Sequence, residues 1–256
     1  MRYFKLFFRA FQVSREKGLF FVIGFGVNNF LGWIRFCFKK KTSFILNGKS
    51  YNYFYHWLGT FSNERCIEVP IIWDEVKQYN GKKVLEVGNV LSNYFSTNHD
   101  VVDKYEKAYG VINQDIVDFH PIKKYDLIVS ISTLEHVGWE EIPKEPLKIL
   151  SAIDNMMDLL EPQGKIVVTL PFGYNPEIIK LIKDGKIHFT QKFCMKRISS
   201  DNKWAEVKYE DIINSKYNEP FPYANGLIIG VIINESGAAA VLSPSSLPHS
   251  GKRHDI

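Results

Sequence analysis

Cysteine is scarce in this sequence, and its spacing excludes two kinds of site. The chain has three cysteines in 256 residues, at positions 37, 66 and 194. They form no Cys-x-x-Cys pair, and no cysteine or histidine cluster has the spacing of metal ligands. An odd number of separated thiols is typical of a reduced, intracellular protein. We therefore expect no metal centre and a cytoplasmic location.

A strong excess of one charge is also missing. The net charge is +4, from 32 basic and 28 acidic residues. Such a mild balance permits contact with anionic lipid or a phosphorylated substrate, but it does not require nucleic acid. No RNA-binding signature or internal repeat is present, so no nucleic-acid partner is expected. Because 45% of the residues are hydrophobic, the chain can bury the core of one α/β domain with extensions.

Apolar runs alternate with helical segments through the middle of the chain. Strands are predicted at residues 84–87, near 100–103, near 110–113, at 126–131, at 165–170 and at 226–233, with a helix near 145–160. Residues 187–198 and 203–208 are further strand candidates. Uninterrupted apolar strands separated by helices predict a parallel sheet covered on both faces.

The first of these strands carries an acid, Glu86, and is followed at once by Gly88. A loop of this kind is typical of sites for the sugar and amino-acid parts of a nucleoside cofactor. The glycine allows close approach of the backbone, and the acid accepts hydrogen bonds from hydroxyl or ammonium groups. The motif alone is weak, because many buried parallel strands end in this way.

The succession of motifs resembles the class I S-adenosylmethionine-dependent methyltransferases. The matching blocks run from Asp126 to Val137 and along LLEPQGKIVVTLP, residues 159–171. The resemblance covers residues 62–233 and implies S-adenosylmethionine as the cofactor. It also implies a Rossmann-like α/β sandwich with a mostly parallel, seven-stranded sheet. In that family the last strand is antiparallel and lies beside the fifth.

The glycine loop departs from the family pattern of an acid followed by three spaced glycines. Val90 and Ser92 stand where later glycines are expected. Valine disfavours positive φ and adds bulk near the ligand. The loop therefore either takes a different path or binds the cofactor less tightly. The polar stretch after Gly88 is also too short for a long first helix.

The resemblance implies roles for several acids. Glu86 accepts from the cofactor's amino-acid end or caps the helix that follows, and Gly88 allows the close approach. Asp103 binds the ribose hydroxyls, with Asp100 as the alternative. Asp115 contacts the adenine amino group or is simply a solvated acid at the end of a strand.

Further candidates follow the fourth and fifth strands. Ser132 lies where the fourth strand opens into the predicted cleft, as a cofactor contact. His136 is the candidate general base for a sugar hydroxyl, although its motif is also compatible with a structural role. Trp139 stacks on a sugar ring or packs in the protein, and Tyr174 and Asn175 are candidates for the acceptor site. Methyl transfer depends mainly on alignment of donor and acceptor.

The N-terminal region, residues 1–41, combines basic and apolar residues. Residues 1–17 form a basic amphipathic pattern, and residues 18–38 are nearly apolar but interrupted by Asn28 and Asn29. This composition favours peripheral attachment to the inner membrane face, with a helical cap or a transmembrane anchor as alternatives. The opposite end, residues 236–256, is predicted to be a flexible tail whose native origin is left open.

Between these regions, residues 42–80 form a lead-in to the catalytic domain, residues 81–235. A hairpin is predicted around Asn47-Gly48, and its aromatic-rich second half lines a substrate mouth or packs in the core. A helix starts after Ser62 or Asn63, and Pro70 kinks or ends it before a second helix.

These observations predict a methyltransferase that O-methylates a sugar of a lipid-linked or surface glycan. The methyl acceptor would be a small-molecule or lipid-linked sugar. Two alternatives stay open. One is a non-catalytic scaffold of the same fold at the membrane surface, and the weaker one is an NAD-linked oxidoreductase.

Overall fold

The computed structural model describes residues 42–56 and 59–236. The predicted membrane-associating segment, residues 1–41, lies outside this range, as does the predicted tail beyond residue 236. Within the described ranges, no helix has both the length and the apolar character that crossing a membrane requires.

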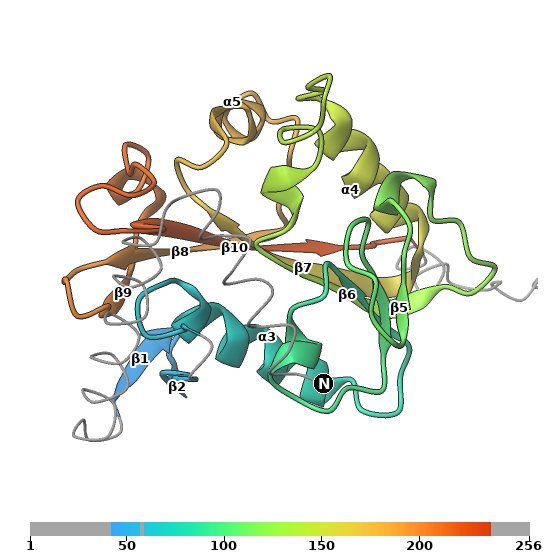
Figure 1. Cartoon of the computed structure of the whole chain (residues 1–256), viewed down its shortest axis with the longest axis horizontal. Coiled ribbons are helices and arrows are strands. Elements are labelled where there is room, and N and C mark those ends of the chain that lie inside the picture. Colours follow the sequence, from blue (N-terminus) through green and yellow to red (C-terminus); the bar gives the residue numbers. More distant parts are fainter. Residues whose placement is uncertain (1–41, 57–58, 237–256) are drawn as a thin grey trace, which may run out of the picture.

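Eight strands form the central sheet in the described part of the chain (Figure 1). In chain order they are β3 (Val84–Val87), β4 (Asp100–Val102), β5 (Val111–Ile112), β6 (Tyr125–Ile131), β7 (Leu160–Pro171), β8 (Gln191–Arg197), β9 (Trp204–Val207) and β10 (Gly226–Ile233). Their spatial order is β5-β4-β3-β6-β7-β10-β8-β9.

The direction of the strands confirms the predicted fold class. Strands β3 to β7 run parallel to one another. The last strand, β10, is antiparallel and lies between β7, the fifth strand of this sheet along the chain, and β8. The predicted count of seven strands was one too low, because β9 adds an antiparallel edge strand to β8.

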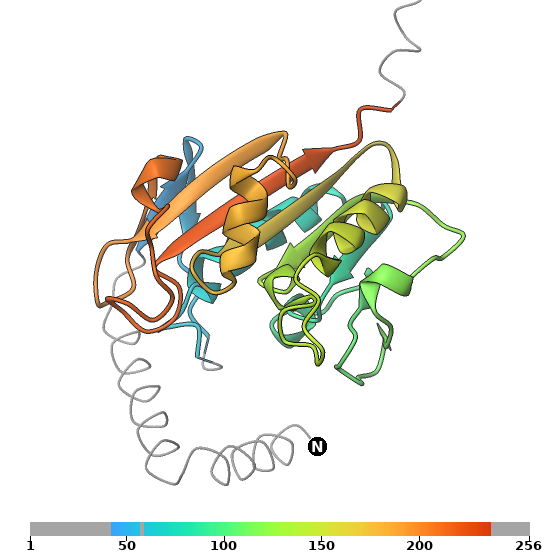
Figure 2. The ribbon, with the colours of Figure 1, turned by 90° about the horizontal axis from the view of Figure 1, so that it is seen from above.

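Helices cover both faces of the sheet. Helices α4 (Lys148–Asp158) and α5 (Pro176–Lys183) lie on one face, and α3 (Arg65–Gln78) lies on the other (Figures 1 and 2). In β6, Ile128 belongs to the core cluster under α4, whereas Val129 belongs to the cluster under α3. Successive side chains of a strand point to opposite faces, so a sheet buried on both sides requires an uninterrupted apolar run.

Helix α3 continues through Pro70, so the predicted alternative in which the helix ends there and a second helix follows is wrong. Proline has no N–H, so the carbonyl of Cys66, four residues earlier, loses its helical donor. The backbone N–H of Phe54 donates to this carbonyl at 2.8 Å. The vacant acceptor therefore attaches the preceding segment to the helix. At the start of α3, the Asn63 side chain accepts from Arg65 N at 3.2 Å.

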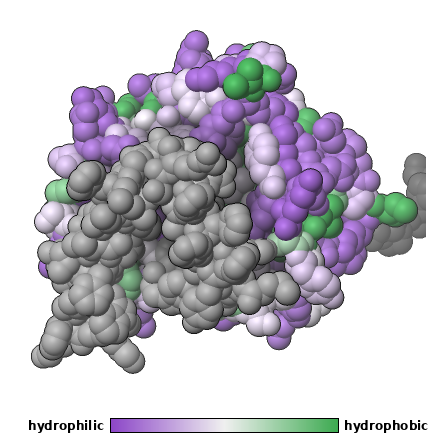
Figure 3. Space-filling model, viewed as in Figure 1, coloured by the Kyte–Doolittle hydropathy of each residue, from purple (hydrophilic) through white to green (hydrophobic). Residues whose placement is uncertain are grey.

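The predicted hairpin is confirmed as β1 (Ser43–Leu46) and β2 (Lys49–Asn52). Asn47 and Gly48 both have positive φ, 48° and 72°, as a tight turn of this kind requires. The hairpin docks beside β9, where Asn47 N donates to Glu206 Oε2 at 2.8 Å. Where described residues are visible in Figure 3, the surface is mostly hydrophilic, with separate apolar side chains.

Candidate functional site

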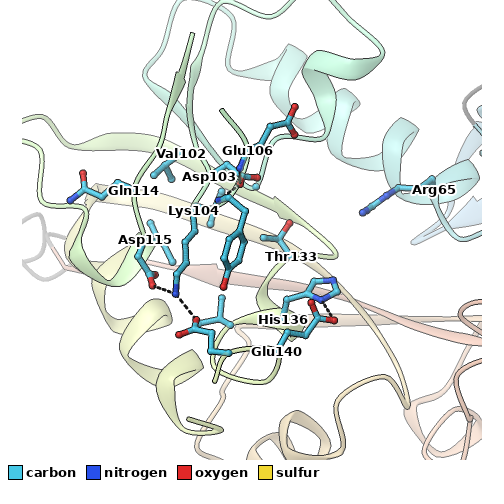
Figure 4. A pocket seen from close by; sticks show the side chains of 16 residues that line it. Arg65, Val102, Asp103, Lys104, Glu106, Gln114, Asp115, Thr133, His136 and Glu140 are labelled. Atoms are coloured by element: carbon cyan, nitrogen blue, oxygen red, sulfur yellow. Dashed lines mark hydrogen bonds and ion pairs between the residues drawn. The ribbon is translucent and has the colours of Figure 1, made fainter. Parts of the chain in front are cut away.

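A cavity of about 630 Å³ lies at the carboxyl ends of four adjacent parallel strands (Figure 4). Most of its lining residues lie at the ends of β3, β4, β5 and β6 or in the loops that follow these strands. The lining residues are Arg65, Val87, Gly88, Val102, Asp103, Lys104, Tyr105, Glu106, Gln114, Asp115, Ile116, Thr133, His136, Val137, Glu140 and Glu141. Ligands of open parallel sheets bind at this edge, because the strand-to-helix turns converge there. Four predicted site residues are brought together here: Gly88, Asp103, Asp115 and His136.

Gly88 has a φ of 85°, and the chain packs tightly against it. A Cβ atom at this position would lie 2.2 Å from Thr133 Oγ1. The glycine is therefore required by the protein's own packing, in addition to the predicted approach of a ligand. Both residues line the cavity.

Glu86 is fully buried and does not line the cavity. Its Oε1 accepts from the N–H groups of Val90 and Leu91 at 2.8 and 2.7 Å, and its Oε2 lies 2.8 Å from His99 Nε2. This geometry matches the predicted alternative of a capping acid, because Leu91 begins the short 3-10 helix η1 (Leu91–Asn93). The direct contact with a cofactor stays a prediction.

The glycine loop keeps its own amides occupied. Gly88 N donates to Val102 O at 2.8 Å, and Asn89 N donates to Asp103 Oδ2 at 3.0 Å. After Val90 the loop turns inward and buries Leu91 completely in the core under α3. Val90, where the resemblance predicts a glycine, thus stands in a short loop whose N–H groups from Gly88 to Leu91 are all bonded within the chain and which contains a single helical turn.

Asp103 lies at the end of β4 and lines the cavity. Besides Asn89, its carboxylate accepts from the N–H groups of Tyr105 and Glu106 at 2.8 and 2.7 Å. These bonds hold the acid in place while leaving it partly exposed. The alternative, Asp100, accepts from Tyr125 OH at 2.9 Å and does not line the cavity. The geometry therefore favours Asp103 over Asp100 as a ligand-binding acid.

Asp115 belongs to a network of two acids and two lysines. Lys104 Nζ lies 2.9 Å from both Asp115 Oδ2 and Glu141 Oε1, and Lys148 Nζ lies 2.8 Å from Asp115 Oδ2. Figure 4 shows Lys104 extending from the end of β4 to this acid. Burial acts to raise the pKa of Asp115, but hydrogen bonds from Lys148 and Lys104 outweigh it and hold the pKa below its ordinary value.

Ser132 is buried and does not line the cavity. Its backbone has a φ of 40°, and its hydroxyl donates to Glu68 Oε1. Glu68 is fully buried and also accepts from Thr169 Oγ1 at 2.7 Å. Ser132 therefore links the end of β6 to α3, and its neighbour Thr133 lines the cavity.

Arg65 is a lining residue that sequence reasoning missed. Its Nη1 donates to Glu68 Oε2 at 2.9 Å and to the carbonyl of Ile131 at 3.0 Å. In Figure 4 the guanidinium points from α3 toward the other lining residues. A held guanidinium binds carboxylates well, because its donors match two oxygens. No local motif marks Arg65, since only the packing of α3 on the sheet brings it to the cavity.

His136 lies in the cavity wall between two glutamates. Its Nδ1 is 2.9 Å from Glu140 Oε1, and its Nε2 is 3.6 Å from Glu135 Oε1. Tyr174 OH donates to Glu140, and its ring meets the imidazole edge to face at 4.9 Å. The predicted base and the predicted acceptor-site tyrosine are thus neighbours, joined through a glutamate that the sequence did not single out.

Three other predicted residues, Trp139, Tyr174 and Asn175, lie outside the cavity lining. Asn175 is buried, caps α5 by accepting from Glu177 N at 3.0 Å and donates to the carbonyl of Glu135 at 3.0 Å. Trp139 has Lys144 Nζ 3.9 Å from its ring centroid. Their predicted substrate contacts stay predictions.

The aromatic run of the lead-in packs against the sheet. Tyr53 OH accepts from Trp204 N at 2.7 Å, and Tyr51, Tyr53 and Phe54 pack on the core under α3. None of these three lines the cavity. Of the two predicted alternatives, the structure favours core packing for them. Among the residues that the structure describes, no group of His, Cys, Asp and Glu side chains is arranged to hold a metal ion.

No protein-family model matches this sequence, and no curated protein matches it. Solved structures of similar fold include the N-methyltransferase NodS from Bradyrhizobium japonicum WM9 in complex with S-adenosyl-l-homocysteine, at 13% identity and a TM-score of 0.38, covering 68% of this chain and 94% of that one. An S-adenosylmethionine-dependent methyltransferase from Clostridium acetobutylicum ATCC 824 has 14% identity and a TM-score of 0.34, covering 64% and 89%. The sugar N-methyltransferase KedS8 from Streptoalloteichus sp ATCC 53650 has 11% identity and a TM-score of 0.33, covering 64% and 86%.

With TM-scores below 0.5, this likeness supports no conclusion about the chain. The strand order and the antiparallel β10 agree with the Rossmann-like arrangement that the sequence resemblance implies. Activity and cofactor are argued from the cavity.

Proposed function

We propose that this protein is an S-adenosylmethionine-dependent methyltransferase. The observation that carries the proposal is the meeting of Gly88, Asp103, Asp115 and His136 in one cavity at the carboxyl edge of the parallel strands. These residues come from four separate segments, and the sequence predicts a different role for each of them in one site. Their convergence at the edge where such folds bind ligands supports a single functional site.

The cavity has the charges that this cofactor needs. Asp103 would accept from the ribose hydroxyls mainly through Oδ2, which accepts one N–H within the described chain, whereas Oδ1 accepts two. Arg65 would bind the carboxylate of the cofactor's amino-acid part. The N–H groups of the glycine loop are not available for this carboxylate, because they already donate to acceptors within the chain. The cofactor supplies an activated methyl group on a positively charged sulfur. Acids in the wall, including Glu106 and Glu140, favour that positive charge.

The proposed acceptor is a hydroxyl of a sugar on a lipid-linked or surface glycan. His136 supports this choice, since an imidazole in the cavity wall is suited to take a hydroxyl proton near neutral pH. The basic, apolar sequence of residues 1–41 supports a location at the cytoplasmic face of a membrane. The acceptor would then be a small-molecule or lipid-linked sugar presented at that surface.

Calorimetric titration with S-adenosylmethionine and S-adenosylhomocysteine tests the cofactor. We expect binding that weakens by about tenfold or more in Asp103→Asn, because hydrogen bonds to a charged group contribute about 1.5–3 kcal/mol each. Glu106→Gln is the matched control: it removes a nearby acid that lines the same cavity. Equal losses in both variants would indicate general electrostatic attraction instead of a ribose site, and no binding to folded wild-type protein would overturn the proposal.

Removal of residues 1–41 tests the membrane location separately. The truncated protein should move from the membrane fraction to the supernatant while its affinity for S-adenosylmethionine stays the same. Unchanged partition between the two fractions would contradict a membrane role for this segment.

The occupied loop amides favour a second candidate, a non-catalytic scaffold of the same fold. Every N–H from Gly88 to Leu91 already has an acceptor within the chain. If the protein is a scaffold, calorimetry should detect no binding of S-adenosylmethionine. The Asp103→Asn variant should then distribute between membrane and supernatant as the wild type does.

A further inference from the structure

The two nitrogens of His136 lie in different surroundings. The imidazole side chain is 37% exposed, yet its Nδ1 atom is buried. This nitrogen faces Glu140, whose Oε1 is 2.9 Å away. The other nitrogen, Nε2, has a more distant carboxylate oxygen at 3.6 Å and is not among the buried, unpartnered atoms of the described residues. Nδ1 therefore has the closer carboxylate, that of Glu140, and Nε2 has no carboxylate oxygen within hydrogen-bond distance among the described residues.

Glu140 is itself held by a second residue. Tyr174 OH donates to Glu140 Oε1, the same oxygen that faces His136. Burial acts to raise the pKa of Glu140, but the contacts with Tyr174 and His136 outweigh it and keep the pKa below its ordinary value. The glutamate is thus an ionised acceptor near neutral pH. Tyr174 is also braced by Tyr217, whose ring meets it edge to face at 5.0 Å.

We propose that Glu140 is the positioning residue for His136 and that Tyr174 orients Glu140. The carboxylate keeps the ring proton on Nδ1, so that Nε2 presents a lone pair to the acceptor hydroxyl. This inference rests on the proposed methyltransferase function and identifies how its base is prepared. The N–H of Nδ1 does not point directly at the carboxylate oxygen. A rotation of the ring completes the bond, as catalytic contacts often tighten when a substrate binds.

The step balances without a further reactant. The acceptor oxygen forms a bond to the methyl carbon as the carbon–sulfur bond breaks, and the sulfur keeps that electron pair. The O–H bond of the acceptor breaks, and its proton passes to Nε2 of His136. Glu140 stabilises the resulting imidazolium and stays ionised, as a carboxylate does beside a catalytic histidine.

Glu135 does not compete for this role. Its side chain is only 2% exposed, and Oε2 has no hydrogen-bond partner among the described residues. Burial raises the pKa of Glu135 well above its ordinary value, with Glu68 adding to the effect. Burial thus disfavours a charge on Glu135, and its Oε1 lies farther from Nε2, at 3.6 Å, than the Glu140 oxygen lies from Nδ1, at 2.9 Å. The two glutamates beside His136 are thus distinguished by burial.

NMR of the full-length chain with 15N-labelled histidine tests the proposal, because the ring nitrogen shifts report which nitrogen carries the proton. His136→Gln assigns the signal among the seven histidines. We expect the Nδ1–H form in the wild type. In Glu140→Gln the ratio of Nδ1–H to Nε2–H should fall by at least about threefold, because a charged acceptor is replaced by a neutral one.

Three further variants test whether the charge of Glu140 and its contact with Tyr174 set the ratio of Nδ1–H to Nε2–H. Glu140→Asp keeps the charge and should restore part of the ratio, and Tyr174→Phe should give an intermediate value. Glu145→Gln removes an exposed acid of the same loop and should change nothing. An Nε2–H ring in the wild type, or the same ratio in Glu140→Gln, would overturn the proposal. Titration of the same samples with S-adenosylmethionine tests the proposed function independently, so the two failures are distinguishable.

Discussion

Gly88 and Thr133 are in such close contact that a Cβ atom on residue 88 would lie 2.2 Å from Thr133 Oγ1. The first comes directly after β3 and the second shortly after β6, and both line the cavity. The positive φ of Gly88 and this contact together exclude any side chain at position 88.

We therefore expect Gly88→Ala to lower the free energy of unfolding by about 2 kcal/mol or more, from backbone strain of about 1–3 kcal/mol together with the clash. Urea denaturation measures this change. Gly110→Ala is the matched control, because Gly110 has a similar φ of 80° but nothing within 4 Å of an added Cβ. Equal losses in the two variants would show that the contact with Thr133 contributes nothing.

Glu86→Gln should destabilise the protein even without a cofactor. The carboxylate accepts from two loop amides and faces His99, all within the fold. We expect a loss of about 1–3 kcal/mol, since buried groups would lose a charged partner. Urea denaturation measures the loss, and faster hydrogen exchange at Val90 and Leu91 would locate it. If Glu86 acted only on the cofactor, stability and exchange of the free protein would be unchanged.

Lys104→Met should strengthen the binding of S-adenosylmethionine several-fold. The lysine amine lies 2.9 Å from Asp115, the acid predicted to contact the adenine amino group, and it adds positive charge to a cavity proposed for a cation. The cost in stability should stay below about 1 kcal/mol, because the side chain is one-third exposed and such ion pairs contribute little.

Calorimetry measures the change in affinity, with Lys148→Met as the control. Lys148 pairs with the same two acids but does not line the cavity, so its loss should affect binding less. Weaker binding in Lys104→Met would instead make this lysine a contact of the cofactor.

The substitution Glu135→Gln should stabilise the protein relative to the wild type, and this gain in stability should increase as pH rises. The pKa of a glutamate in the unfolded chain is about 4.3, whereas burial raises the pKa of Glu135 in the folded chain. Between the two values the folded state binds more protons, so the wild type loses stability as pH rises through this window.

Glutamine cannot ionise and avoids that loss. Thermal unfolding at about pH 5 and about pH 8 should show the advantage of the variant growing toward the higher pH. Glu145→Gln, at an exposed position, should show a constant difference from the wild type. An advantage of Glu135→Gln that shrinks with rising pH would contradict the assigned direction.

Sequence reasoning located the parallel strands because their residues are apolar without interruption, which only a doubly covered sheet requires. It placed a kink or an end of the helix at Pro70, because a proline removes a helical hydrogen bond. In the structure the helix continues, and a distant N–H, that of Phe54, donates to the vacated carbonyl of Cys66. A local rule cannot anticipate a donor supplied from outside the helix.

The lining of the cavity is a second feature that the sequence predicts only in part. Gly88, Asp103, Asp115 and His136 were found from their places after strands, but Arg65 was not, because α3 reaches the site only by packing on the sheet. Glu86 had the right sequence position, yet the fold commits both of its oxygens to partners within the chain.

The sequence by itself determined the succession of strands and the residues that stand at their carboxyl ends. Hydrophobic patterning is a local property, and parallel strands bring those ends to one edge. Only the tertiary structure decided which side chains face the cavity. That choice depends on hydrogen-bond partners far apart in the chain, as for Ser132 and Glu68, which are 64 residues apart. A polar group withdrawn from water must find such a partner, and the partner's position is a property of the whole fold.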